Sequence, residues 1–160
     1  MRSDDRILRR ARNNAYSLLR SRPRSEAEIR ARLKLKGYGP SVIEDTVGFL
    51  KRCGEIDDAK FARLWVESRM RFNPMGKMVL RRELKEKGIS DSIIEATLAE
   101  KDADYDEYKV AFSMAKEKFG RLAKIESKKA LKRLHDFLAR RGFAYDIIQR
   151  IIDGIIDENG

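Results

Sequence analysis

The chain has 160 residues, of which 42% are hydrophobic and 39% are charged, and its formal net charge of +10 gives a pI of about 9.8. A basic surplus of this size favours polyanionic partners, nucleic acid above all. No apolar run approaches the roughly 18 residues that a membrane helix needs, no signal-peptide core follows the first five residues, and a single cysteine excludes an internal disulfide, so we expect a cytoplasmic protein without membrane contact.

The first third of the chain predicts three helices. The first is expected to end shortly before Pro23, because proline disfavours helix in the residue before it. Ser25 and Glu28 have the spacing of a capping box, which starts a second helix. Pro40 suits the first turn of a third helix, which is expected to end near Cys53 with this cysteine packed as a small apolar residue.

The middle of the chain has the same order of elements. Asp57 and Asp58 open a helix, and we interpret them as acids at the positive dipole end of that helix rather than as metal ligands. Trp65 in this helix is expected to pack in the core. After a break at 72–76, a further helix ends at Gly88, where we expect a positive φ because only glycine adopts the left-handed conformation cheaply.

The last third of the chain differs in two respects. After an acidic segment at 102–107, which is expected to begin a helix, the connection at 119–129 is expected to be longer than its counterparts and is strongly basic. The final helix, from Tyr145 to about Asp157, has six isoleucines. We expect it either to cover the end of the array or to pack on the preceding group of helices.

Three glycines organise the whole chain: Gly37, Gly88 and Gly142 lie 51 residues (from 37 to 88) and 54 residues (from 88 to 142) apart. Apolar residues recur at −8, −4, +1, +5, +6 and +10 from each glycine, which is a strong signal of an internal repeat. These residues are Ile29, Leu33, Tyr38, Val42, Ile43 and Val47 in the first copy, Leu80, Leu84, Ile89, Ile93, Ile94 and Leu98 in the second, and Leu134, Leu138, Phe143, Ile147, Ile148 and Ile152 in the third.

One more apolar helix precedes each copy, and in the second copy its markers are Phe61, Leu64, Trp65 and Val66. No run alternates between apolar and polar residues as a strand would. The sequence therefore predicts an all-α fold of three tandem three-helix repeats at residues 6–54, 57–101 and 104–157. Because such repeats contact only their neighbours, we expect an elongated, curved array, right- or left-handed, and a monomer.

Basic residues also recur at fixed positions. Lys77, Arg81 and Lys85 are spaced by four, so they form one stripe along a helix, which we expect to be exposed. The first repeat has Arg30 and Lys34 at corresponding positions, whereas the third repeat has no cation there. The residue before each glycine is basic as well, for which the helix dipole is an alternative reason. The candidate binding residues are Arg30, Lys34, Lys36, Arg69, Lys77, Arg81, Arg82, Lys85, Lys87, Arg140 and Arg141.

The sequence contains no recognisable catalytic constellation. His135 is the only histidine, and it lies 82 positions from Cys53 without any local zinc spacing. Neither a phosphate-binding glycine loop nor a Gly-x-Ser-x-Gly motif occurs. We therefore expect a protein that is not an enzyme and that holds no cofactor or metal ion.

Several motifs together resemble the RecX family, the regulators of the RecA recombinase. The resembling motifs are Arg22–Ser25 with Glu28, Leu33–Tyr38, Asp58–Ala62 with Arg69, Gly76, Glu83–Ile89 and Arg140–Phe143. The resemblance covers nearly the whole chain. It implies three tandem three-helix repeats that bind within the groove of the RecA–single-stranded DNA filament, with suppression of strand exchange and ATP hydrolysis.

A second hypothesis is a DNA-binding protein of the helix-turn-helix type that acts without a recombinase, because a helix, a short glycine turn and a helix can serve as that motif. The apolar face after each glycine favours packing within the array instead. Under the first hypothesis, single-stranded DNA is contacted either directly or through the filament.

Overall fold

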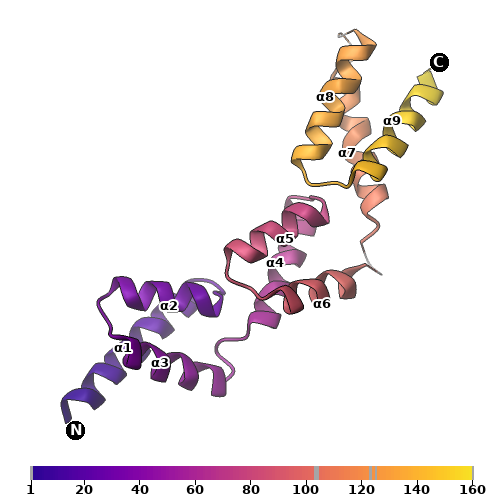
Figure 1. Ribbon diagram of the computed structural model, residues 1–160. Coiled ribbons are helices and arrows are strands. Elements are labelled where there is room, and N and C mark those ends of the chain that lie inside the picture. The colour runs from indigo at the N-terminus through magenta and orange to yellow at the C-terminus, as the bar shows by residue number, and fades with distance from the viewer. Residues whose placement is uncertain (1, 103–104, 123, 125, 160) are drawn as a thin grey trace. The chain divides into compact units, whose positions relative to one another are not determined.

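The computed structural model of the protein describes residues 2–102, 105–122, 124 and 126–159. Within these ranges the chain forms helices and no strands, which confirms the predicted all-α class (Figure 1). The helices are α1 (Arg2–Ser21), α2 (Glu26–Leu35), α3 (Pro40–Arg52), α4 (Asp58–Phe72), α5 (Lys77–Glu86), α6 (Asp91–Lys101), α7 (Glu107–Arg121), α8 (Ser127–Arg140) and α9 (Tyr145–Asn159). None of the described helices is long and apolar enough to cross a membrane.

The chain divides into two compact units. One contains Met1–Trp65 and Leu84–Ile94, and the other contains Val66–Glu83 and Glu95–Gly160. Residue 104, where the third repeat was expected to begin, lies outside the described residues, as does residue 103 of the acidic segment. The three repeat boundaries, the curved array and the monomeric state stay predictions.

In the first unit, α1, α2 and α3 pack around one apolar core. Its fully buried members come from all three helices and include Ala11, Ala15, Ile29, Leu33 and Val47. The small alanines of α1 let the other two helices approach closely. Burial of each large aliphatic side chain contributes about 1.5–3 kcal/mol relative to its exposure to water.

In the second unit, α7, α8 and α9 form a core of the same kind. Ala111 and Ala115 of α7 meet Leu134 and Leu138 of α8 and the isoleucines of α9. The residues that α9 contributes to this core are Ile148, Ile151 and Ile155. The apolar face of α9 is therefore buried against α7 and α8, its own group of helices. Of the two alternatives expected for this helix, these contacts do not support packing on the preceding group, and the covering of the array's end stays a prediction.

The three turn glycines have the backbone that the sequence predicts. Their φ angles are +85° at Gly37, +77° at Gly88 and +81° at Gly142. After Gly88, the amide of Ile89 donates to the carbonyl of Leu84 at 3.1 Å, and the same bond recurs after the other two glycines. This is the Schellman arrangement, in which the carbonyls left free at the helix end gain donors.

Four local expectations need correction or refinement. Leu64 is 42% exposed, so it does not belong to the core, and Trp65 is half-buried. Cys53 ends α3 as predicted, but it is exposed rather than packed. The connection between α7 and α8 comprises residues 122–126 and is one residue longer than its counterparts at 22–25 and 73–76, as expected, although both helices extend into the basic segment.

Candidate functional site

Two of the candidate arginines, Arg30 and Arg81, form ion pairs with glutamates of the helix that follows in the chain. Arg30 on α2 pairs with Glu44 on α3, with one N–O distance of 3.1 Å. Arg81 on α5 makes two bonds to Glu95 on α6, at 2.7 and 3.0 Å. Each arginine lies seven residues before its turn glycine and each glutamate seven residues after it. These pairs are partly exposed, so each contributes little to stability.

The same positions explain why the third repeat has no basic stripe. Seven residues before and after Gly142 stand His135 and Gln149. The ring of His135 lies edge-on to Tyr145 instead, with ring centroids 6.4 Å apart. In the third repeat both the cation and its acid are thus replaced. Arg30 and Arg81 therefore belong to an intramolecular ion pair that occurs in the first two repeats.

The rest of the central stripe is also engaged. Lys77 pairs with Asp102, and its side chain is 31% exposed. Lys85 pairs with Asp91 at 3.0 Å, but both side chains are more than half exposed. Of the three stripe residues only Lys85 is an exposed cation of the kind that the spacing predicts, because the neighbouring helix partly covers Lys77 and Arg81.

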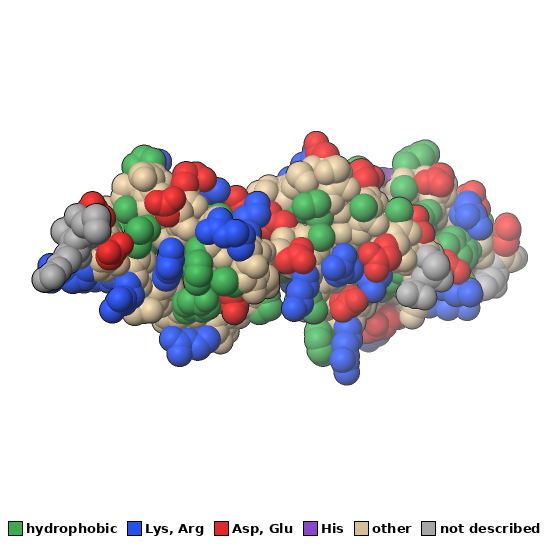
Figure 2. All heavy atoms as spheres, turned by 90° about the horizontal axis from the view of Figure 1, so that it is seen from below, with side chains coloured by type: hydrophobic (Ala, Val, Ile, Leu, Met, Phe, Trp, Pro, Cys, Tyr) green, Lys and Arg blue, Asp and Glu red, His purple; other side chains and the backbone are tan. Residues whose placement is uncertain are grey.

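The remaining candidate cations fall into two groups. Lys34, Lys36 and Arg140 are exposed, and they form no ion pair within the described part of the chain; Arg82 is exposed as well. Arg69 is half-buried, and its Nε donates to Glu83 at 2.8 Å. Figure 2 shows the result on one face, where basic and acidic side chains alternate within each part of the chain instead of forming a field of one sign.

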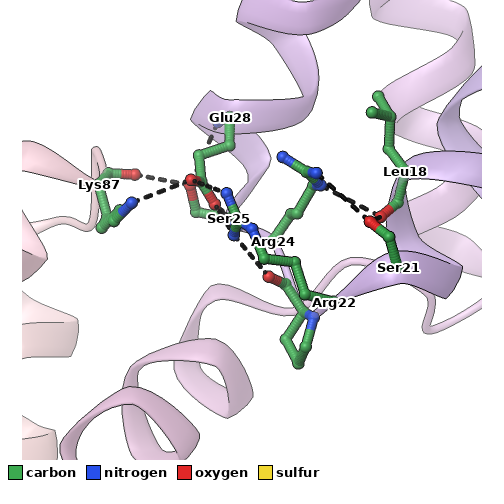
Figure 3. Close-up of polar contacts among 8 residues, drawn as sticks. Leu18, Ser21, Arg22, Arg24, Ser25, Glu28 and Lys87 are labelled. Atoms are coloured by element: carbon green, nitrogen blue, oxygen red, sulfur yellow. Dashed lines mark hydrogen bonds and ion pairs between the residues drawn. The ribbon is translucent and has the colours of Figure 1, made fainter. Parts of the chain in front are cut away.

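Lys87 belongs to a contact between the turn after α5 and the start of α2 (Figure 3). The hydroxyl of Ser25 donates to the carbonyl of Lys87 at 2.6 Å, and the ammonium of Lys87 donates to Glu28 at 3.1 Å. The same hydroxyl accepts from the amide of Glu28, and the carboxylate of Glu28 accepts from the amide of Ser25, which confirms the predicted capping box. The capping box therefore starts α2 and also binds a turn 62 residues further along the chain.

The charge on Glu28 depends on these contacts. Burial alone would raise the pKa of this carboxyl, but hydrogen bonds from Arg22, Lys87 and the Ser25 amide outweigh it and lower the pKa to about 2. Arg22 reaches the carboxylate with two bonds, at 2.9 and 3.2 Å. Glu28 is therefore ionised throughout the neutral range and serves as the acceptor that joins three segments.

An acid that the sequence analysis assigned to its own helix completes this contact. Asp57 caps α4 as expected, since it accepts from the amide of Lys60 at 2.9 Å. Asp58 instead accepts from the amide of Glu26, at the start of α2, at 2.8 Å. Burial raises the pKa of Asp58. We call the set Ser25–Glu28 with Asp58, Lys87 and Gly88 the first junction.

The second unit contains an equivalent contact, made by Arg141. The amide of Gly76 donates to the carbonyl of Arg141 at 2.7 Å, and the amide of Lys77 donates to Glu107 at 3.1 Å. The guanidinium of Arg141 also donates to the side chain of Asn73 at 2.6 Å. We call the set Gly76–Val79 with Glu107, Arg141 and Gly142 the second junction.

Both junctions require glycine for a second reason besides φ. A Cβ placed on Gly88 would lie 2.3 Å from the Cβ of Ala27, and one on Gly142 would lie 2.5 Å from a methyl of Val79. A Cβ on Gly76 would lie 2.0 Å from the carbonyl oxygen of Gly142. Sequence reasoning missed both junctions, although one signal was present. Their acids, Asp58 and Glu107, occupy the same position, four residues before a buried alanine (Ala62 and Ala111).

Comparison with known protein families also divides the chain into three groups of three helices. Three family models match the chain: RecX, first three-helix domain, at residues 11–50; RecX, second three-helix domain, at residues 57–98; and RecX, third three-helix domain, at residues 104–152.

Several curated relatives bear the name regulatory protein RecX. The chain is 32% identical over 152 residues to the one from Amycolatopsis mediterranei (strain U-32), covering 95% of this chain and 86% of the relative. It is 38% identical over 141 residues to the one from Chlorobium phaeobacteroides (strain BS1), covering 88% and 90%. A crystal structure of RecX from Lactobacillus salivarius has the same fold, with a TM-score of 0.84 over 94% of this chain and 97% of that one, at 23% identity.

Proposed function

The chain belongs to the RecX family, and from this membership we propose that it is a cytoplasmic regulatory protein that binds the RecA–single-stranded DNA filament and mainly inhibits its ATPase and strand-exchange activities. The proposal includes a direct or filament-mediated contact with DNA, a monomeric protein and no catalytic activity of its own. The observation that supports it best is the set of exposed cations on, or directly after, the helices that precede the turn glycines: Lys34, Lys36, Arg82, Lys85 and Arg140.

These cations are suited to an acidic partner for an electrostatic reason. Phosphates and carboxylates attract exposed lysine and arginine at long range, which speeds association at low salt. The half-buried cations Arg30, Arg69, Lys77, Arg81, Lys87 and Arg141 have acids or backbone groups of this chain as partners. We propose that this second set positions the binding helices, and that the exposed set makes the contacts.

The direct test is a RecA ATPase assay on single-stranded DNA with this protein titrated in. Lys34→Glu/Lys85→Glu/Arg140→Glu reverses three exposed positions and should weaken inhibition by about tenfold or more, because each reversal turns an attraction into a repulsion. The matched control, Arg9→Glu/Arg52→Glu/Lys60→Glu, makes the same change in net charge at exposed residues of the first unit. Equal inhibition by both triple variants would refute the proposed contact set, and no effect of the wild-type protein would refute the function.

The helix-turn-helix alternative predicts tight binding to duplex DNA without any recombinase. It needs a recognition helix with a free outer face after the turn. In the first unit Ile43, Val47 and Leu50 of α3 are buried in the core, and Glu44 faces Arg30. Tight, recombinase-independent duplex binding in a direct titration would favour the alternative.

A further inference from the structure

One of the three turn glycines, Gly37, differs from the other two in its surroundings. A Cβ placed on Gly37 meets no atom of the described residues within 4 Å, whereas Gly88 and Gly142 lie against Ala27 and Val79. No residue in the described part of the chain donates to the carbonyl of Lys36, although the equivalent carbonyls at both junctions accept bonds of 2.6 and 2.7 Å. The turn between α2 and α3 therefore presents an uncovered version of the surface that binds a helix start at each junction.

This surface is hollow and partly apolar. A depression of about 400 Å³ lies at the turn, and we call its lining the open turn face: Ile7, Arg10, Asn14, Lys36, Gly37 and Tyr38. Asn14 donates to the Tyr38 hydroxyl at 2.6 Å, which fixes the wall of the hollow. Ile7 is 42% exposed, and Leu35 next to Lys36 is 78% exposed. Exposed apolar side chains around a hollow are typical of a surface that binds protein rather than phosphate alone.

The open turn face is more basic than the first junction, because it lacks an acid and has an additional arginine. Counted from the buried alanines Ala11 and Ala62, Ile7 stands where Asp58 stands, Arg10 where Phe61 stands, and Asn14 where Trp65 stands. At the first junction, Asp58 accepts the first amide of the bound helix. Ile7 cannot accept a hydrogen bond, so an amide placed there would be buried without a partner, at a cost of about 1–3 kcal/mol. The face therefore favours a helix whose first residue is proline, which has no N–H and commonly stands at this position.

Among the helices that precede a turn glycine, α2, α5 and α8, a second copy of the chain offers no free start of this kind. The starts of α2 and α5 are already bound at the two junctions. In α8 the position twelve residues before the turn glycine, where Ser25 and Gly76 stand in the other two, is Ala130, which is buried inside the helix. The first turn of α8 is basic, with Lys128 and Lys129, and would be repelled by Arg10 and Lys36.

We propose that the open turn face binds the first turn of a helix from a partner protein, with proline against Ile7, a small residue on Gly37 and a carboxylate between Lys36 and Arg10. The carboxylate takes the place that Glu28 has beside Lys87, at 3.1 Å. A serine cap on the partner helix donates to the Lys36 carbonyl as Ser25 does to that of Lys87.

The first experiment does not depend on the identity of the partner. A helical peptide of about 18 residues, long enough to hold a helix in water, begins Ser-Pro-Ala-Glu and is titrated into the full chain while the amide NMR signals of Asn14, Gly37 and Tyr38 are followed. Saturable shifts confined to the open turn face are expected, with about tenfold weaker binding when the fourth residue is lysine. Absence of shifts, or equal shifts with the lysine peptide, would overturn the proposal.

The second experiment rests on the proposed function and uses the RecA–single-stranded DNA filament as the probe. Arg10→Glu/Lys36→Glu should reduce filament binding by about tenfold, while Arg9→Glu/Arg52→Glu, with the same charge change outside the face, should reduce it by about threefold at most. Equal binding by the two variants would overturn the inference. A parallel loss of binding to bare single-stranded DNA would reassign the face to nucleic acid, and a wild-type dimer abolished by the variant would reassign it to a second copy. Failure of the wild-type chain to bind filament would refute the proposed function, and the peptide titration would still decide the inference.

Discussion

Replacing Gly88 by alanine should destabilise the protein far more than the same change at Gly37. Both positions have a positive φ, +77° and +85°, so both variants lose about 1–2 kcal/mol from left-handed strain. Only at Gly88 does the new Cβ meet an obstacle, the Cβ of Ala27 at 2.3 Å. Carbon atoms approach comfortably to about 3.5–4.0 Å, so the first junction must open by more than an ångström, and overpacking of this kind costs about 1–3 kcal/mol.

The expected loss is therefore about 1–2 kcal/mol for Gly37→Ala and about 2–5 kcal/mol for Gly88→Ala. Urea unfolding followed by circular dichroism measures both. A second substitution isolates the contact: Ala27→Gly removes the obstacle, so Gly88→Ala should cost about 1–3 kcal/mol less in that background, although Ala27→Gly itself costs about 1 kcal/mol in helix propensity. Equal losses at Gly37 and Gly88, or additive losses in the double variant, would refute the steric reasoning at this junction.

Three further predictions follow from other contacts. The pKa of Glu28 is lowered from an ordinary value of 4.5 to about 2. The ionised carboxylate therefore contributes at most about 3 kcal/mol to the free energy of unfolding; this contribution is present above pH 4.5 and is lost as the pH falls towards 2. Urea titrations at several pH values should show that Glu28→Gln lacks this part of the acid sensitivity. The Arg30–Glu44 pair, of which Glu44 is mostly exposed, should give only the small coupling of an exposed ion pair in a double-mutant cycle, and a coupling typical of a buried pair would show that it is less solvated than its exposure indicates. Gly154 lies inside α9 with open space at its Cβ position, so Gly154→Ala should raise the free energy of unfolding by about 1 kcal/mol, and a loss would show a contact there.

The sequence was informative wherever a local rule determines the structure. The capping box at Ser25, the left-handed turns at Gly37, Gly88 and Gly142, and the all-α class all follow from interactions between residues that are near one another in the chain, and all are confirmed. The repeat spacing also identified buried positions, because a residue at the same offset in three copies meets the same environment.

The part of the candidate site that could not be predicted depends on contacts over long sequence distances. The spacing of Lys77, Arg81 and Lys85 indicates one helix face, but it does not indicate that acids of the next helix lie beside Lys77 and Arg81. The role of Asp58 was hidden because an acid at the start of α4 has a sufficient local reason to be there. Its bond to the amide of Glu26 spans 32 residues, and no periodicity within a single helix reports such a partner.

The two junctions use corresponding parts, and this has a consequence for how such chains can change in length. Ser25 and Gly76 both donate to the carbonyl that precedes a turn glycine, and Asp58 and Glu107 both accept the first amide of a helix. The fit is nevertheless specific to each turn, because Ser25 stands where Gly76 stands, and a Cβ on Gly76 would lie 2.0 Å from the carbonyl oxygen of Gly142. A gene that lost the middle segment would join the start of α2 to the turn at Gly142, and that junction would close only after Ser25 became glycine. A change in the number of repeats therefore requires a matched substitution at the new junction.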